Sequence, residues 1–161
     1  MQIDETDAPT GSLIYPFSQA EAHYTDAFAA PLSGSVALED YIAAFYTTPL
    51  FKAERLVLGL AGAKSTDAEA YALARAQRDC FAVWTVEERR PSEILLAERS
   101  GHTKSWLAIG EGQLWFGSVV VPGFRRGRLT IGPVFQSLMG AHKVYSRLLL
   151  RAAIRKLSKA T

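Results

Sequence analysis

Between positions 35 and 77, apolar residues recur at intervals of three and four, which is the spacing of one face of an α-helix. Three short helices are therefore expected in this stretch. The second begins at Pro49, because a proline at the first helical position loses no hydrogen bond. The third begins at a capping box, in which the side chains of Thr66 and Glu69 satisfy each other's backbone N–H groups. The predicted helices span 36–46, a stretch from 49 that Gly59, Gly62 and the cluster 64–66 end, and 67–77.

From position 81 the pattern changes to short runs rich in β-branched, aliphatic and aromatic residues, separated by turn residues. Runs joined by only two or three residues can pair only as antiparallel neighbours. The sequence thus predicts a four-strand meander, preceded nearer the N-terminus by one short strand over 23–28. The strands of the meander are expected at 81–89, 93–99, 103–109 and 113–121.

A long final helix is expected from Pro133 to about residue 157. Its roughly 25 residues would extend about 37 Å at 1.5 Å per residue, enough to lie across the sheet. His142 and Tyr145 are the polar members of its apolar stripe, and they lie one turn apart. The stripe consists of Leu138, Ala141, His142, Tyr145, Leu148, Leu149 and Ala152.

The parity of strand pairing sorts the sheet into two faces. It predicts that Trp84, Trp106 and Trp115 share one face, together with Arg99. The tryptophans alternate there with Ala and Gly, and this large-and-small pattern suits a concave surface against a helix. We therefore expect the tryptophan face to meet the final helix. The other face is also apolar, so we expect the N-terminal arm or a second copy of the chain to cover it.

The chain has 161 residues, about the size of one domain. Residues 1–20 are interpreted as an extended N-terminal arm and 21–161 as a single domain. With 48% apolar and 21% charged residues, the composition excludes disordered and disulfide-rich classes. A single cysteine, Cys80, and an acidic start predict a cytoplasmic location. No transmembrane segment is expected, because every apolar run is far shorter than about 20 residues.

Charge is distributed unevenly along the chain. Residues 1–50 contain seven acids and no Lys or Arg, whereas residues 112–161 contain nine Lys or Arg and no acid. We interpret this as an acidic N-terminal part that lies against the basic C-terminal part. No nucleic-acid partner is expected, because no binding motif accompanies the basic residues. The basic stretch 125–128 is interpreted as a solvated loop, with gating of a cavity or docking on acidic lipid as alternatives.

The order of these elements resembles the helix-grip fold of START-like and birch-pollen-allergen-like proteins, the SRPBCC superfamily. Within it, the chain looks similar to a bacterial family of unknown function over roughly residues 22–158. That resemblance implies an α+β fold, in which an antiparallel sheet wraps around the long C-terminal helix and encloses an apolar cavity. The superfamily includes lipid carriers, polyketide cyclases and hormone receptors, so the fold alone does not select a function. The resemblance is carried by residues 26–28 before the first helix, by the meander over 81–121, and after it by Pro133, Phe135, His142, Tyr145 and 148–150.

The candidate chemistry centres on His142 and Tyr145. Inside an apolar cavity they would bond a ligand carbonyl or hydroxyl, or transfer a proton. The alternative is a core histidine that bonds to the backbone and to Tyr145. Arg99 would stack on Trp84 and pair with a ligand carboxylate, or simply extend to water. No metal site or cofactor is expected, because three histidines and one cysteine show no ligand spacing.

The leading hypothesis is a small-molecule-binding protein that holds an apolar or amphipathic ligand between the sheet and the final helix. One alternative is an enzyme of the cyclase, aromatase or hydrolase kind that uses His142 and Tyr145, although no catalytic residue is assigned. Another is a module that forms a homodimer through an apolar sheet face. The expected ligand-binding residues are Trp84, Arg99, Trp106, Trp115, His142 and Tyr145.

Overall fold

The structure, a computed structural model, describes residues 2–32, 34–60, 62–125, 128–130 and 133–159, and over 124–139 only the backbone. It is an α+β fold, as predicted. The strands are β1 (Asp4–Thr6), β2 (Tyr24–Pro31), β3 (Cys80–Phe81), β4 (Trp84–Arg90), β5 (Glu93–Glu98), β6 (Thr103–Gly110), β7 (Gln113–Val120), β8 (Gly123–Arg125) and β9 (Arg128–Thr130). The helices are α1 (Tyr15–Ser18), α2 (Leu38–Tyr46), α3 (Pro49–Leu60), α4 (Asp67–Ala74) and α5 (Pro133–Leu157).

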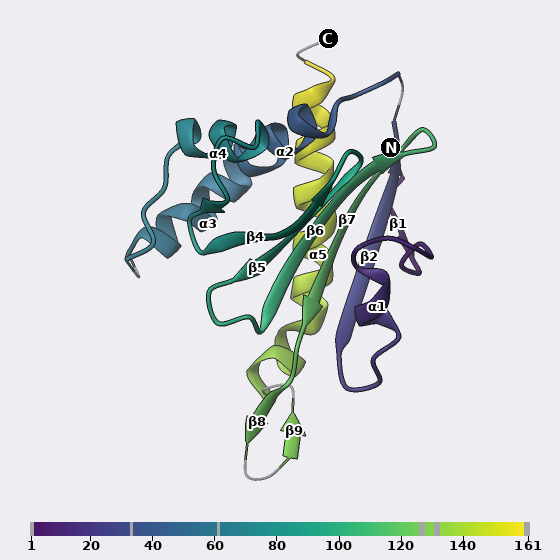
Figure 1. The fold of residues 1–161 in the computed structure, drawn as a ribbon, viewed down its shortest axis with the longest axis vertical. Coiled ribbons are helices and arrows are strands. Elements are labelled where there is room, and N and C mark those ends of the chain that lie inside the picture. The colour runs from purple at the N-terminus through teal and green to yellow at the C-terminus, as the bar shows by residue number, and fades with distance from the viewer. Residues whose placement is uncertain (1, 33, 61, 126–127, 131–132, 160–161) are drawn as a thin grey trace.

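One antiparallel sheet carries the fold, in the order β1-β2-β7-β6-β5-β4-β3, and β8 and β9 form a separate hairpin. The four-strand meander is confirmed as β4 to β7. Figure 1 shows α5 running along the sheet, with α2, α3 and α4 grouped to one side. This arrangement is consistent with a helix-grip fold. No helix in the described ranges is both long enough and apolar enough to span a bilayer.

The short-range signals in the sequence, such as the capping box, predicted the positions of the short helices closely. The capping box at the start of α4 is present, with Thr66 and Glu69 bonded reciprocally. The helix ends at Ala74, earlier than expected, and Ala76 just beyond it has a φ of 55° that no right-handed helix can contain. The predicted strand 81–89 is divided between β3 and β4 by a turn in which Ala82 has a φ of 54°.

The main core lies between the sheet and α5. Phe28, Phe116, Leu107 and Ile94 are register partners and form an apolar row across four strands. Four buried residues of α5 belong to the same core, so its C-terminal half packs directly on the sheet. Burial of each of the larger side chains among them, leucine or isoleucine, contributes about 1.5–3 kcal/mol. The four are Leu149, Leu150, Ala153 and Ile154.

The prediction that the tryptophan face meets the final helix is wrong for two of the three rings. Trp106 and Trp115 belong to a second cluster on the outer face, packed against Leu13 and Ile14 of the N-terminal arm. The indole N–H of Trp106 donates to Glu93 Oε2 at 2.7 Å, and the backbone N–H of Leu13 donates to the same oxygen at 2.8 Å. The arm therefore covers the tryptophan face, and the opposite face meets α5.

Trp84 lies on the other side of the sheet because β4 contains a β-bulge. The register shifts between Val86 and Glu88, so Trp84 and Val86 lie opposite Glu98 and Leu96 on the helix-facing side. Trp84 packs against the main core there. The prediction that all three tryptophans share one face is therefore wrong, because a single extra residue reverses the parity of the strand.

The acidic N-terminal part does contact the basic final helix. Glu5 in β1 forms ion pairs with Lys143 and Arg147 of α5, the second at 3.0 Å. These pairs confirm the interpretation of the charge asymmetry. Within the arm, β1 extends the sheet beside β2, and α1 follows it. The basic stretch 125–128 falls partly outside the described residues.

Candidate functional site

A short row of polar residues crosses the otherwise apolar helix-facing surface of the sheet. Asp26 of β2 lies opposite Ser118 of β7, which in turn lies opposite Ser105 of β6. All three are buried. The neighbouring row contains Phe28 and Phe116, so these polar groups sit beside aromatic rings. Buried polar side chains need partners, and α5 supplies one of them.

His142 of α5 closes this row. Its Nε2 lies 2.7 Å from Ser118 Oγ and 3.4 Å from Asp26 Oδ2. Ser118 donates to Asp26 Oδ1 twice, from Oγ at 2.5 Å and from its backbone N–H at 3.1 Å. A serine hydroxyl has only one proton to donate. Because that proton lies in the hydrogen bond to Asp26, the bond between His142 Nε2 and Ser118 Oγ has the imidazole as its donor.

The carboxylate of Asp26 is the electrostatic centre of the cluster. Burial acts to raise its pKa, but the hydrogen bonds from His142 and Ser118 outweigh this effect, and the pKa lies below its ordinary value. Asp26 is therefore ionised at neutral pH. Tyr24 donates to Asp26 Oδ2 at 2.9 Å, and burial together with the charge of Asp26 raises the pKa of that phenol. Tyr24 stays protonated and keeps donating.

A second pair, half-buried, joins α3 to α5. The hydroxyl of Tyr145 donates to Glu54 Oε2. Burial raises the pKa of Glu54, and the hydrogen bond from Tyr145 and the charge of His142 reduce that rise without cancelling it. The site thus holds two carboxyl groups, Asp26 and Glu54, whose pKa values are moved in opposite directions near one imidazole. Two carboxyl groups whose pKa values are moved apart in this way are suited to act as a proton donor and a proton acceptor.

The structure gathers only part of the predicted site. His142 and Tyr145 lie on one side of α5 and both contact buried carboxyl groups, but their described bonds are to Ser118, Asp26 and Glu54 rather than to each other. Arg99 follows β5, where its guanidinium donates to Ala82 O at 3.4 Å.

Arg99 and two of the tryptophans lie away from His142. Ala82, the partner of Arg99, stands in the turn between β3 and β4, at the edge of the sheet opposite β2. Trp106 and Trp115 are on the outer face, and Trp84 is on β4. The structure therefore does not assemble the six predicted ligand-binding residues into one site.

Sequence reasoning missed Tyr24, Glu54, Asp26 and Ser118 as members of the site. One local signal was available: Asp26 alternates with Phe28 and Ala30 along β2, so it had to share their buried face. A buried acid requires partners, and this requirement marks Asp26 as unusual. Glu54 carried no comparable signal, because it lies in a helix that is mostly exposed.

Serine, histidine and aspartate meet here, but not in the order that activates a nucleophile. In a catalytic triad the serine proton goes to histidine, and the acid orients the other ring nitrogen. Here Ser118 donates to Asp26, and His142 Nε2 contacts both groups. Ser118 is therefore not an activated nucleophile in this geometry. The described residues also contain no grouping of three or more side chains suited to hold a metal ion.

Fold and site together define an α+β protein with a helix laid on an antiparallel sheet and a buried acid–imidazole cluster at their junction. No family model, curated protein or solved structure matches this chain.

Replacing Glu54 with glutamine is expected to stabilise the protein at neutral pH, because glutamine stays uncharged in the site where burial raises the pKa of Glu54. The raised pKa of Glu54 means that stability is full below its unfolded value and falls as pH rises through its folded value. Glutamine removes that loss and still accepts from Tyr145. Urea unfolding at pH 4 and pH 7 measures the effect, with the exposed Glu21→Gln as control. A variant less stable than wild type at pH 7 contradicts the expectation.

Proposed function

We propose that this chain is a small-molecule-binding protein of the START-like superfamily, which holds an apolar or amphipathic ligand between the sheet and the first half of α5. The observation that carries the proposal is the state of His142. Its side chain is 24% exposed, yet buried Ser118 and Asp26 hold its Nε2 in a fixed orientation. An oriented imidazole between an apolar wall and solvent is suited to anchor the polar end of a ligand.

A second buried group on α5 supports the proposal. Ser146 lies one turn beyond His142 and is fully buried, and its Oγ has no hydrogen-bond partner among the described residues. An unsatisfied buried hydroxyl costs about 1–3 kcal/mol. A ligand or a water molecule at the junction would remove that cost.

The charges favour a ligand with a neutral polar end. The ionised carboxylate of Asp26 lies 3.4 Å from His142 Nε2, and a ligand carboxylate placed there would meet its repulsion. A hydroxyl or carbonyl group accepts or donates a hydrogen bond without that penalty. The proposed ligand is thus an apolar molecule with an alcohol or ketone group, and a cytoplasmic location remains a prediction based on the single cysteine.

Long-chain alcohols and ketones are expected to bind at least tenfold more tightly than the fatty acid of equal length. Isothermal titration calorimetry measures this, after native mass spectrometry of freshly purified protein has tested for a retained ligand. His142→Gln keeps a donor for Ser118 and should weaken binding at least tenfold without unfolding the protein. The exposed Arg151→Ala is the matched control. If no compound binds and no added mass is found, the proposal is wrong.

An enzyme that transfers protons is the second candidate, favoured by the opposite pKa shifts of Asp26 and Glu54 around His142. The same incubations separate the two functions. A bound compound recovered with unchanged mass supports a binding protein, and a chemically altered compound supports an enzyme. A hydrolase that uses Ser118 is not proposed, because that hydroxyl donates to Asp26.

The homodimer was proposed because an apolar sheet face was expected to be open, but both faces of the sheet are packed against other parts of the chain. Residues of the N-terminal arm, Leu13, Ile14 and Phe17 among them, pack over the outer face, and α5 packs on the other. A dimer would need a different surface.

A further inference from the structure

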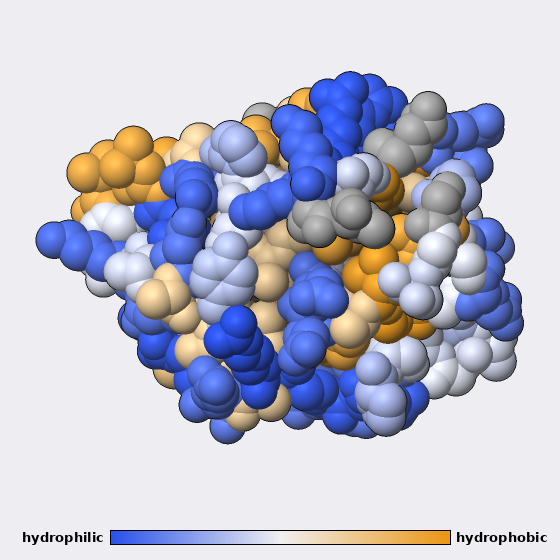
Figure 2. Space-filling view, turned by 90° about the horizontal axis from the view of Figure 1, so that it is seen from above, coloured by the Kyte–Doolittle hydropathy of each residue, from blue (hydrophilic) through white to orange (hydrophobic). Residues whose placement is uncertain are grey.

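Helix α3 presents an apolar surface that the rest of the fold does not cover. Leu56, Val57 and Leu60, here named the α3 patch, are 70%, 65% and 85% exposed. Phe51 is the buried residue of this helix. Figure 2 shows an apolar cluster with hydrophilic side chains beside it at the left edge of the molecule, the side on which α3 and α4 lie in Figure 1. Large aliphatic side chains gathered at such exposure indicate a binding surface.

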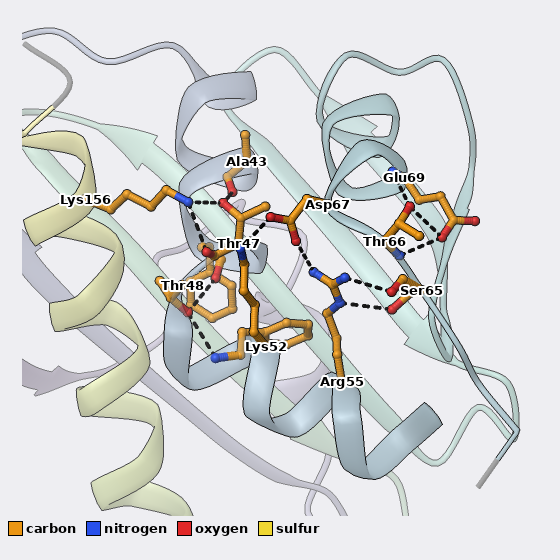
Figure 3. A network of polar contacts seen from close by, with 12 residues as sticks. Ala43, Thr47, Thr48, Lys52, Arg55, Ser65, Thr66, Asp67, Glu69 and Lys156 are labelled. Atoms are coloured by element: carbon orange, nitrogen blue, oxygen red, sulfur yellow. Dashed lines mark hydrogen bonds and ion pairs between the residues drawn. The ribbon is translucent and has the colours of Figure 1, made fainter. Parts of the chain in front are cut away.

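Polar contacts between α3 and the start of α4 fix the direction in which the α3 patch points. Arg55, with a side chain only 10% exposed, donates to Ser65 Oγ at 3.1 Å, to Ser65 O at 2.7 Å and to Asp67 Oδ1 at 2.7 Å. Lys52 pairs with the other oxygen of Asp67 at 2.5 Å. Figure 3 shows Lys52 and Arg55 reaching Asp67 and Ser65 between α3 and the start of α4. These bonds fix the rotation of α3, so that Leu56, Val57 and Leu60, on the side next to Lys52, stay exposed.

Positive charge flanks the α3 patch. Lys52 and Lys64 line a cleft of about 760 Å³ together with Leu56 and Leu60. Over residues 49–78 the chain has five Lys or Arg and three Asp or Glu. The three acids are engaged: Asp67 with Lys52 and Arg55, Glu69 with Arg78, and Glu54 with Tyr145.

We propose that the α3 patch docks this protein on the surface of a bilayer that contains anionic lipid. Protruding aliphatic side chains enter the boundary between head groups and acyl chains, and the exposed Lys64 beside them reaches lipid phosphates. A second copy of the chain fits less well, because three side chains fall far short of the roughly 800 Å² per partner that a stable dimer buries. A single bound amphiphile fits less well too, because Leu56 and Leu60, which line the cleft, are 70% and 85% exposed and enclose little of a ligand.

Co-sedimentation of the full chain with vesicles tests the proposal. Binding is expected to vesicles of phosphatidylcholine with about one third phosphatidylglycerol, and to be at least tenfold weaker with phosphatidylcholine alone or in about 0.5 M salt. L56S/L60S should reduce binding at least tenfold. Leu148→Ser on α5, a residue 45% exposed, is the matched control and should bind as wild type does.

Any one of three outcomes overturns the proposal. These outcomes are no binding of wild type to anionic vesicles, equal binding to neutral ones, or undiminished binding by a folded L56S/L60S protein. Circular dichroism checks the fold of both variants, and the exposed positions should leave it intact. A wild-type dimer in sedimentation velocity that L56S/L60S abolishes assigns the patch to self-association instead.

Discussion

Replacing Asp26 with alanine should lower the free energy of unfolding at neutral pH by about 3–5 kcal/mol, the cost of leaving one side of a buried charged pair without its partner. The substitution removes the acceptor of the Ser118 hydroxyl and backbone N–H and of the Tyr24 hydroxyl, and takes the carboxylate from His142. Urea unfolding monitored by circular dichroism measures the loss.

Asp26→Asn is the matched control, because it keeps the shape and one acceptor oxygen for Ser118. The two variants should also differ from wild type in their pH dependence. The lowered pKa of Asp26 means that its contribution is present above the unfolded value of about 4 and is lost as pH falls through the folded value. The gap between wild type and Asp26→Asn should therefore close in acid. A gap that is unchanged between pH 7 and pH 3 contradicts the assigned ionisation.

Gly117→Ala should destabilise the protein by about 3 kcal/mol, the upper part of the usual range for overpacking. A Cβ at this position would lie 2.7 Å from Ile14 Cδ1, 2.8 Å from Asp26 O and 3.0 Å from a ring carbon of Trp106. The carbonyl of Asp26 is backbone in the neighbouring strand and cannot turn aside. Either β2 and β7 separate, or Ile14 and the arm leave the outer face.

Gly110→Ala is the control for Gly117→Ala. Its Cβ would lie 3.8 Å from Trp115, an ordinary contact, and its backbone does not have a positive φ. Thermal unfolding should thus show a large drop in Tm for Gly117→Ala and little change for Gly110→Ala. Increased proteolysis of residues 1–20 in the folded Gly117→Ala protein would indicate that the arm has left the sheet. Equal Tm values for the two variants would exclude a steric role for Gly117.

These two substitutions probe opposite faces of the same pair of strands. Asp26 and Ser118 point toward α5 and join it to β2 and β7 through His142. The next residues along, Ala27 and Gly117, point toward the arm. Adjacent residues at the centre of the sheet therefore contact α5 on one face and the N-terminal arm on the other. A substitution on one face is expected to disturb the packing on the other face.

Local interactions made most of the elements predictable. Pro49, Pro133 and the Thr66–Glu69 capping box mark the beginnings of α3, α5 and α4, because each acts on backbone groups within one turn. Short connections between apolar runs likewise allowed only antiparallel pairing in the meander. The polar positions His142 and Tyr145 followed from the 3.6-residue period of the final helix.

Long-range contacts made the remaining site unpredictable. The Ser118–Asp26 bonds join residues 92 positions apart, and the Tyr145–Glu54 bond joins residues 91 positions apart. Such contacts depend on which strands become neighbours and in what register. Counting alternate residues along the strand placed Trp84 on the wrong face for a similar reason. The bulge after Val86 arises from the pairing of β4 with β5 and is not visible in β4 alone.

The amino-acid sequence by itself determined the order and type of the central elements, α2 to α4, the meander and α5, and the polar pair on α5, because those features depend on residues within a few positions of one another. Only the tertiary structure decided which sheet face meets α5, which face the N-terminal arm covers, and which side chains surround His142. Those choices depend on the packing of distant segments, where one extra residue in β4 moves an indole ring from one side of the sheet to the other.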